Sequence, residues 1–140
     1  MRVSARCDYA CKALLELSLH WPNEEPLQIH TISDRQNIPL NYLIQILIQL
    51  KRVGFVESSR GKEGGYKLAK LPGQISLGEV IRQITGRLLP LAEAAKGNGS
   101  VFSDIWSELE DVMTGMLDKI TFEDISNKAK GTKKAIVYQI

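Results

Sequence analysis

A face of amide side chains is the part of the sequence best suited to contacting a nucleic acid. At helical spacing between residues 39 and 53 lie Asn41, Tyr42, Gln45, Gln49 and Arg52. Amide groups form paired hydrogen bonds with the edge of adenine, and a segment without Asp or Glu does not repel phosphate groups. Gln and Asn are also common on solvated helix surfaces. By itself, this face therefore fits DNA binding and plain solvent exposure equally well.

A basic, glycine-rich turn follows this helix. Residues 55–59 and 66–70 alternate in the manner of two β-strands, and Arg-Gly-Lys-Glu-Gly-Gly turns between them. Arg60 and Lys62 lie at the tip, and Ser59 precedes them. An arginine at such a tip can enter a narrow minor groove, where the negative potential is enhanced. The alternative is a hairpin whose charges only keep it soluble, but the order of helix, turn, amide-rich helix and basic hairpin favours a winged helix-turn-helix.

Two cysteines one helical turn apart form a second chemical feature. Cys7 and Cys11 fall in a predicted first helix with Asp8 between them, and the chain holds no other cysteine. In a reducing compartment this spacing suits metal binding or thiol chemistry better than a disulfide. The alternative is a pair of buried small hydrophobic side chains, a common role of free cysteine.

The composition is that of a folded protein whose charge is unevenly distributed. Of the 140 residues, 44% are hydrophobic and 24% are charged, which excludes a disordered chain. Residues 51–70 hold six basic side chains against two acidic ones, whereas residues 100–127 hold seven acidic side chains against Lys119 alone. One region is therefore suited to a polyanion and the other is not.

Neither a targeting segment nor a catalytic constellation stands out. The first residues lack the apolar stretch of a signal peptide, and the longest charge-free run, 36–50, is too short to cross a bilayer. We therefore expect a cytoplasmic protein without membrane contact. His20 and His30 lie far from any serine or acidic cluster that would suggest hydrolysis, and no phosphate-binding glycine loop is present. We expect no enzyme activity.

The elements that position these residues are predicted to be mostly α-helical, with a small β-hairpin wing. Hydrophobic periodicity predicts helices over 3–19, 29–36, 39–53, 76–85 and 101–119, and a final short helix from Thr121. The third helix has an apolar stripe made of Leu40, Leu43, Leu47 and Leu50, with Ile44 and Ile46 beside it. We expect a winged helix-turn-helix domain at 1–85 and a connector, dimerisation helix and short C-terminal helix at 86–127. A basic tail at 128–140 is then either disordered or in contact with phosphates.

The long helix at 101–119 has an unusually broad apolar face. Its apolar side chains recur by threes and fours: Phe102, Ile105, Trp106, Leu109, Val112, Met113, Met116, Leu117 and Ile120. Such a face on a helix outside a compact domain predicts pairing with a second copy of the chain. The expected dimer contacts are Ile105, Trp106, Leu109, Val112, Met113 and Met116. The alternative is that the helix packs back onto its own domain.

Several segments together resemble a known family. They are residues 1–4, 9–10, 13–17, 32–38 and 54–56, the wing at 59–68 with its Arg-Gly and Gly-Gly-Tyr, and the Ser-Leu-Gly-Glu-Val-Ile at 76–81. These segments resemble the Rrf-type regulators, the group of IscR, NsrR and CymR. The resemblance implies a homodimeric bacterial transcription regulator that dimerises through the helix at 101–119. It also implies that Asn41, Tyr42 and Gln45 contact the major groove and Arg60 the minor groove.

The cofactor is where the sequence departs from that family. Cluster-binding relatives carry three cysteines in the connector before the dimer helix, whereas residues 87–102 here contain none. Thiolates are the usual ligands of iron–sulfur clusters. Some relatives supply a carboxylate ligand from the position of Asp8. Cys7, Asp8, Cys11 and His30 are therefore a candidate non-standard site for an iron–sulfur cluster or a metal, and thiol oxidation is a further alternative.

Together these features predict a homodimeric, sequence-specific DNA-binding transcription regulator that senses a redox, iron–sulfur or sulfur-metabolic state. Its expected partners are double-stranded DNA, a second copy of the chain and a regulatory protein. Two other classes stay open. One is a winged-helix module that binds proteins, and the other is a metal- or cluster-binding protein whose DNA role is secondary.

Overall fold

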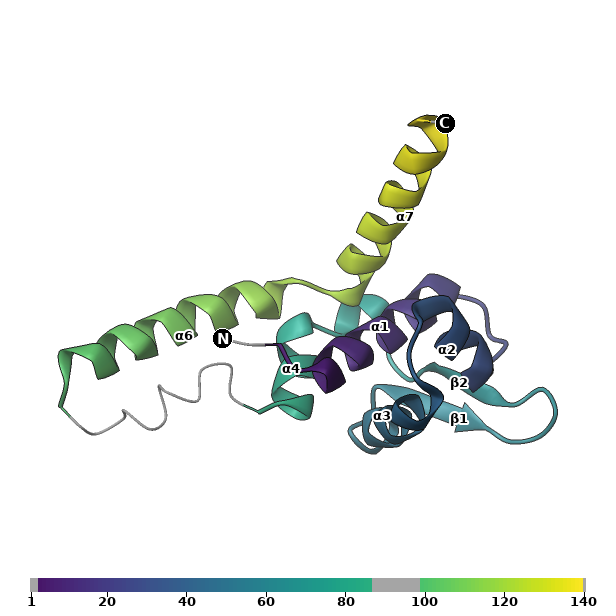
Figure 1. The fold of residues 1–140 in the computed structure, drawn as a ribbon, viewed down its shortest axis with the longest axis horizontal. Coiled ribbons are helices and arrows are strands. Elements are labelled where there is room, and N and C mark those ends of the chain that lie inside the picture. The colour runs from purple at the N-terminus through teal and green to yellow at the C-terminus, as the bar shows by residue number, and fades with distance from the viewer. Residues whose placement is uncertain (1–2, 87–98, 140) are drawn as a thin grey trace.

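The computed structural model describes residues 3–86 and 99–139, with side chains as far as residue 132. In chain order the elements are α1 (Ala5–His20), α2 (Ile29–Gln36), α3 (Leu40–Arg52), β1 (Val56–Ser59), β2 (Gly65–Leu68), the 3-10 turn η1 (Pro72–Gln74), α4 (Leu77–Ile84), α6 (Val101–Lys119) and α7 (Phe122–Gln139) (Figure 1). The predicted class is confirmed: the chain is mostly α-helical with one β-hairpin. In Figure 1, α6 and α7 both extend away from the body formed by α1, α2, α3, α4 and the hairpin.

Local signals in the sequence set where the first three helices begin and end. The Ser4 hydroxyl accepts a hydrogen bond from the Cys7 amide at 3.1 Å and so caps the start of α1. Asn37, in the left-handed conformation with φ 52°, ends α2. Pro39 then precedes α3, where a missing amide donor costs nothing. As a result, α2 and α3 join through a tight turn of the helix-turn-helix type.

One apolar core holds these elements together. Its buried members are Ala10, Ala13, Leu14, Leu17, Leu27, Ile32, Ile38, Leu43, Ile46, Leu47, Leu50, Phe55, Val56, Ile75, Val80 and Phe122. They come from all three helices of the helix-turn-helix region, from β1, from α4, from the first residue of α7 and from the segments between elements, which supply Leu27, Ile38, Phe55 and Ile75. The core therefore includes a residue from beyond the predicted domain limit at residue 85, although the division into 1–85, 86–127 and 128–140 itself stays a prediction.

The loop before α2 holds the hairpin against the body through backbone hydrogen bonds. Strands β1 and β2 pair antiparallel, with Val56 opposite Leu68 and Ser59 opposite Gly65. Leu27 adds a short bridge to the free edge of β2, exchanging two 2.8 Å backbone hydrogen bonds with Tyr66. A Cβ on Gly65 would collide with the Leu27 carbonyl. Glycine at position 65 thus lets the loop approach closely and fixes where the wing starts.

Helix α7 is longer than the sequence predicts. We expected a short helix from Thr121 and an irregular tail from residue 128, but α7 continues to Gln139. Thr121 and Asp124 cap its start by exchanging hydrogen bonds of 3.1 and 3.2 Å. The segment after them contains no proline, and a single glycine, Gly131, is not enough to end a helix. None of the helices in the described residues has the length and apolarity needed to cross a membrane.

Helix α6 is attached to the body through α4, at a point where only glycine fits. A Cβ added to Gly78 would collide with the Asp118 side chain and lie 3.1 Å from the Asp118 backbone nitrogen. Asp118 is itself held by Arg82, whose Nη1 lies 2.7 Å from its Oδ1. We expect Gly78→Ala to lower the free energy of unfolding by about 1–3 kcal/mol, as measured by urea denaturation.

Gly115, within α6, is the matched control for this substitution, because a Cβ added there meets no atom within 4 Å. Gly115→Ala should leave stability unchanged or raise it by up to about 1 kcal/mol, since alanine is the better helix former. Equal destabilisation by both substitutions would show that the fit between α4 and α6 is not the cause.

Candidate nucleic-acid interface

The outer face of α3 carries the predicted base-contacting side chains. Asn41, Tyr42, Gln45 and Arg52 are exposed, while Leu43, Ile46, Leu47 and Leu50 on the opposite face are buried in the core. This division follows from the 3.6-residue period of the helix. The apolar side chains orient α3 so that its amide-bearing face points to solvent. No acidic residue occurs anywhere in α3.

Two isoleucines that sequence reasoning missed lie on this same exposed face. Ile44 was predicted beside the buried stripe, but 38% of its surface is exposed, and Ile48 is 43% exposed. Each isoleucine directly precedes a glutamine of the amide face. A helical wheel drawn from residue positions alone would therefore have placed both isoleucines on the exposed side of α3. Apolar side chains on such a face can contact the methyl group of thymine.

Gln49, another predicted DNA contact, is only half-exposed and uses both ends of its amide within the protein. Its Oε1 accepts hydrogen bonds from Arg6 Nε at 3.0 Å and Arg6 Nη2 at 2.6 Å. Its Nε2 donates to the backbone carbonyl of Gln83 at 3.3 Å. Gln49 thereby links α3 to the start of α1 and to α4. We call these contacts among Arg6, Gln49 and Gln83 the Arg6–Gln49 clamp.

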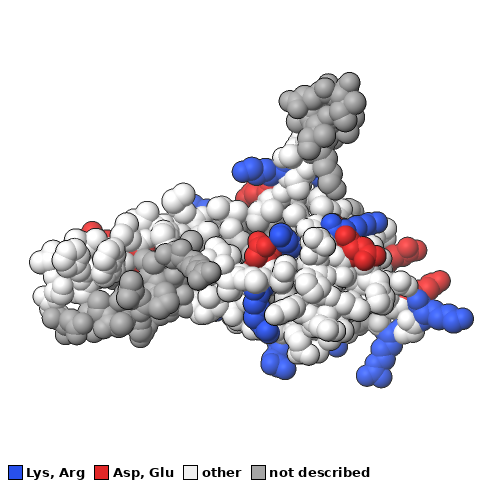
Figure 2. Space-filling view, in the orientation of Figure 1, with Lys and Arg blue, Asp and Glu red and all other residues white. Residues whose placement is uncertain are grey.

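The hairpin and α3 lie at the same edge of the molecule (Figure 1). Ser59, Arg60 and Lys62 are all exposed. Figure 2 shows basic side chains projecting from the end of the wing and from the lower edge of the winged body. Gln28 Nε2 donates to the Lys62 carbonyl at 3.2 Å, which ties the wing to the loop before α2. Within the described part of the chain, the Arg60 side chain forms no hydrogen bond or ion pair that would oppose an approach to DNA.

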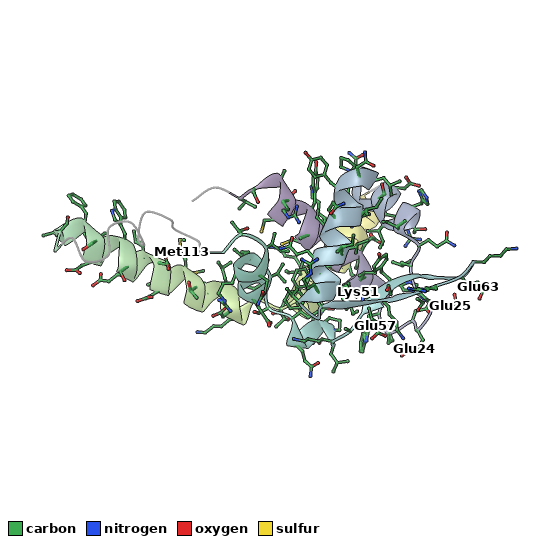
Figure 3. The ribbon with its side chains drawn as sticks, turned by 90° about the horizontal axis from the view of Figure 1, so that it is seen from below. Glu24, Glu25, Lys51, Glu57, Glu63 and Met113 are labelled. Atoms are coloured by element: carbon green, nitrogen blue, oxygen red, sulfur yellow. The ribbon has the colours of Figure 1, made fainter. Side chains whose placement is uncertain are left out.

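Other charged side chains near the wing are engaged in structural contacts. Lys67 Nζ lies between Glu24 Oε2 at 3.1 Å and Glu57 Oε1 at 3.3 Å, and these carboxylates raise the pKa of Lys67. Lys51 Nζ donates to Ser58 Oγ at 2.7 Å and so joins α3 to β1. Figure 3 shows Lys51 on α3 beside the hairpin. Lys51 and Lys67 therefore hold the wing against the body.

An aromatic pair borders the α3 face on the side of α1. The rings of Tyr9 and Tyr42 have centroids 6.0 Å apart and are tilted by 54°. Lys12 lies 6.0 Å from the centre of the Tyr9 ring and forms an ion pair with Asp8 at 2.9 Å. The Tyr42 ring therefore packs against Tyr9 of α1 on one side and remains exposed on the other.

The two cysteines touch each other at the contact between α1 and α4. Cys7 is 3% exposed and Cys11 is half-buried. The Cys11 thiol donates a hydrogen bond to the Cys7 sulfur, which lowers the pKa of Cys7 to about 6, and a hydrogen bond from Thr85 acts in the same direction. The same contact and burial raise the pKa of Cys11. The contact therefore makes Cys7 the more acidic thiol of the pair.

The predicted metal ligands do not come together within one chain. Among the described residues, no three His, Cys, Asp or Glu side chains are placed to share a metal ion. Asp8 is paired with Lys12, and His30 is exposed on α2. Because both cysteines of the chain lie on α1, a four-thiolate cluster site has too few donors here. The described residues do not fit an iron–sulfur cluster.

Comparisons with known proteins agree with this geometry. The family model described as "Rrf2: Iron-dependent Transcriptional regulator" matches residues 3–128. The HTH-type transcriptional regulator IscR of Cronobacter sakazakii is 35% identical over 132 residues, covering 91% of this chain and 81% of its own. CymR of Bacillus subtilis is 29% identical over the full length of both chains.

Solved structures show the same likeness. The structure of CymR, the global cysteine regulator of B. subtilis, superposes with a TM-score of 0.81 at 28% identity, covering 91% of this chain and 98% of its own. The structure of T. potens IscR superposes with a TM-score of 0.79 at 32% identity, covering 92% and 88%.

Proposed function

This chain belongs to the Rrf2 family of transcriptional regulators, and from that premise we infer that it acts as a homodimer on a specific, roughly palindromic DNA site in the cytoplasm. The observation that carries this proposal is the acid-free, exposed face of α3 at the same edge as the Arg60 wing (Figure 1). Asn41, Tyr42 and Gln45 would contact base edges in the major groove. Arg60 would enter the minor groove.

The exposed apolar stripe of α6 supports the dimer. Its exposed members are Phe102, Ile105, Leu109, Val112 and Met116. They are spaced by alternating threes and fours, the repeat of a helix that pairs with another helix. Of the six predicted contacts, Trp106 and Met113 are half-buried and border this stripe on one side. Phe102 stacks on Trp106 with ring centroids 6.1 Å apart, so Trp106 would support the stripe from behind.

The signal we propose is a redox or sulfur-metabolic state sensed through thiols. The family model is described as iron-dependent and the relative CymR as a cysteine regulator. The described residues do not assemble the ligands of a cluster, whereas Cys7 and Cys11 form a paired thiol at the contact between α1 and α4. This observation favours direct thiol chemistry over cluster chemistry in this chain.

Salt-dependent binding to DNA tests the proposal. Purified reduced protein should shift the DNA upstream of its own gene in a gel. Its affinity should fall steeply between two salt concentrations, because bound phosphates release counterions. A shift with little salt dependence, or none at either concentration, would favour the module that binds proteins instead. A footprint with two symmetric halves is expected for the dimer.

Arg60→Ala should weaken binding to that DNA by roughly fivefold to a hundredfold, the range expected when an arginine that contacts base edges is lost, about 1–3 kcal/mol. The measurement is a titration at fixed salt. Lys119→Ala is the control, because it removes an exposed positive charge at the end of α6, away from the wing. If both variants lost affinity equally, net charge and not the wing contact would be responsible.

Gln45 and Gln49 offer a matched test of which amide contacts bases. Gln45→Ala should change the preferred base at one position in each half-site, because its side chain is exposed. Gln49→Ala should instead weaken all sequences alike, by up to about tenfold, because it breaks the Arg6–Gln49 clamp. Binding selection from a randomised site would show the difference. A changed base preference in Gln49→Ala would contradict this assignment.

A further inference from the structure

We propose that the cavity between the end of α1, the turn η1 and the start of α7 binds a free α-amino acid with an apolar side chain. This binding site goes beyond the proposed function and shares no residue with the face assigned to DNA. Figure 1 shows α7 leaving the body on the side opposite α3 and the hairpin. Binding of a small molecule at this cavity can therefore be measured without DNA.

The cavity is large enough for a small molecule and is formed by three separate parts of the chain. Its volume is about 340 Å³, within the range of small-molecule sites. Ser18 and Trp21 line it at the end of α1, residues 71–74 line it along η1, and one face of α7 supplies the rest. That face carries, at the spacing of one side of a helix, Glu123, Ser126, Asn127 and Lys130.

A buried hydroxyl without a partner indicates that a ligand belongs in this cavity. Ser126 lines the cavity and is only 4% exposed, and within the described residues its hydroxyl forms no hydrogen bond. Buried polar groups in folded proteins are nearly always hydrogen-bonded. The neighbouring hydroxyl of Ser18, 2% exposed, already donates to the Leu14 carbonyl at 2.7 Å. The cavity therefore offers a ligand one hydroxyl that can only accept a hydrogen bond and one that can also donate.

Two opposite charges border the same cavity without forming an ion pair. Glu123 and Lys130 lie on one face of α7, two turns or about 10 Å apart along the helix axis. Among the residues that the structure describes, neither side chain has a hydrogen bond or ion-pair partner. A Cβ added to Gly73 would lie 2.5 Å from Glu123 Oε2, so this carboxylate lies against η1 at the cavity wall. The flexible four-carbon chain of Lys130 can reach toward it, which leaves room for a small zwitterion between the two charges.

The apolar part of the lining selects the rest of the ligand. Trp21 and Leu71 border the cavity with 43% and 50% of their surfaces exposed, beside the buried Pro72. Covering these side chains with an apolar group removes apolar surface from water, which is favourable. A small molecule that joins an ammonium group, a carboxylate and an apolar group at one carbon is an α-amino acid with an apolar side chain. A fatty acid lacks the ammonium group, and a long peptide holds its two terminal charges far apart.

Isothermal titration calorimetry tests the class of ligand. L-leucine, L-methionine or L-phenylalanine should bind the purified protein with a dissociation constant of about 1 mM or tighter, which so few ligand atoms can reach. N-acetyl-L-leucine lacks the ammonium group and L-leucinamide lacks the carboxylate, so each should bind about tenfold or more weakly than L-leucine. The proposal is overturned if none of the three amino acids binds, or if either derivative binds as tightly as L-leucine.

Substitutions on α7 test where the amino acid binds. Glu123→Gln and Lys130→Gln should each weaken L-leucine binding by about tenfold or more, because each removes one charged partner. Lys128→Gln is the matched control and should bind like the wild type, since Lys128 is exposed on the same helix but does not line the cavity. L-leucine should also raise the melting temperature of the wild type and of Lys128→Gln, but not that of Glu123→Gln. Unchanged affinity in Glu123→Gln or Lys130→Gln, or an equal loss in Lys128→Gln, would contradict this site.

Discussion

Leu109→Glu should convert the protein into a monomer and lower its affinity for the operator by roughly a hundredfold or more. Leu109 lies at the centre of the exposed α6 stripe and is flanked by Ile105 and Val112. In a paired helix its side chain would be buried, and burying an unpaired carboxylate is strongly unfavourable. A monomer contacts one half-site and loses the gain in affinity from binding both halves together, typically a hundredfold or more. Sedimentation equilibrium and operator titration measure the two effects.

Ser107→Glu is the control for this substitution. Ser107 is exposed on α6 on the side opposite the stripe, so a new carboxylate there stays in water. It should leave the dimer intact and change operator affinity little. A dimeric Leu109→Glu protein with normal affinity would show that α6 does not pair through this stripe. Equal loss in both variants would point to added negative charge instead of the interface.

Phe122→Ala should lower the free energy of unfolding by about 3–5 kcal/mol, the cost of removing a fully buried phenylalanine. Phe122 is 0% exposed although it is the first residue of α7, and its amide donates to the Ile75 carbonyl at 3.0 Å. The substitution would empty a part of the core shared by α7, α4 and the winged body. Denaturation in urea at several protein concentrations measures the change.

Phe102→Ala is the matched control, because it removes the same atoms from a side chain that is 61% exposed in one chain. Its effect should depend on protein concentration, since Phe102 lies on the proposed dimer stripe and oligomer stability follows mass action. The Phe122→Ala effect should not depend on concentration. A small loss in Phe122→Ala would mean that α7 is not part of the folding unit.

The helices were largely predictable because apolar residues on the buried face of a helix recur every three or four positions. The predicted ranges for α2 and α6 agree with the structure, and α3 differs by one residue at each end. Helix α7 was predicted too short because a lysine-rich, weakly apolar segment resembles a tail, although it contains no residue that stops a helix. The turn η1 has too few residues to produce a periodic signal.

Only the part of the candidate site that lies on the single helix α3 was predictable from the sequence. Spacing along α3 placed Asn41, Tyr42 and Gln45 on its outer face, and the structure keeps them exposed there. Spacing could not show that Gln49 is held by Arg6, because these residues are 43 positions apart. Ile44 and Ile48 were missed for a different reason: their spacing puts them beside the amide face, but their hydrophobicity assigned them to the core.

The sequence by itself determined the type and order of the elements and the basic wing, because these depend on neighbours a few residues apart. It also determined the family, and that both cysteines lie on α1 with none at 87–102. The tertiary structure decided which side chains meet across elements. It joined Arg6 to Gln49 and Gln83, brought Thr85 to Cys7 and left His30 apart from the cysteines. Such contacts depend on how α1, α3 and α4 pack around one core, and residue spacing within a single element does not encode that packing.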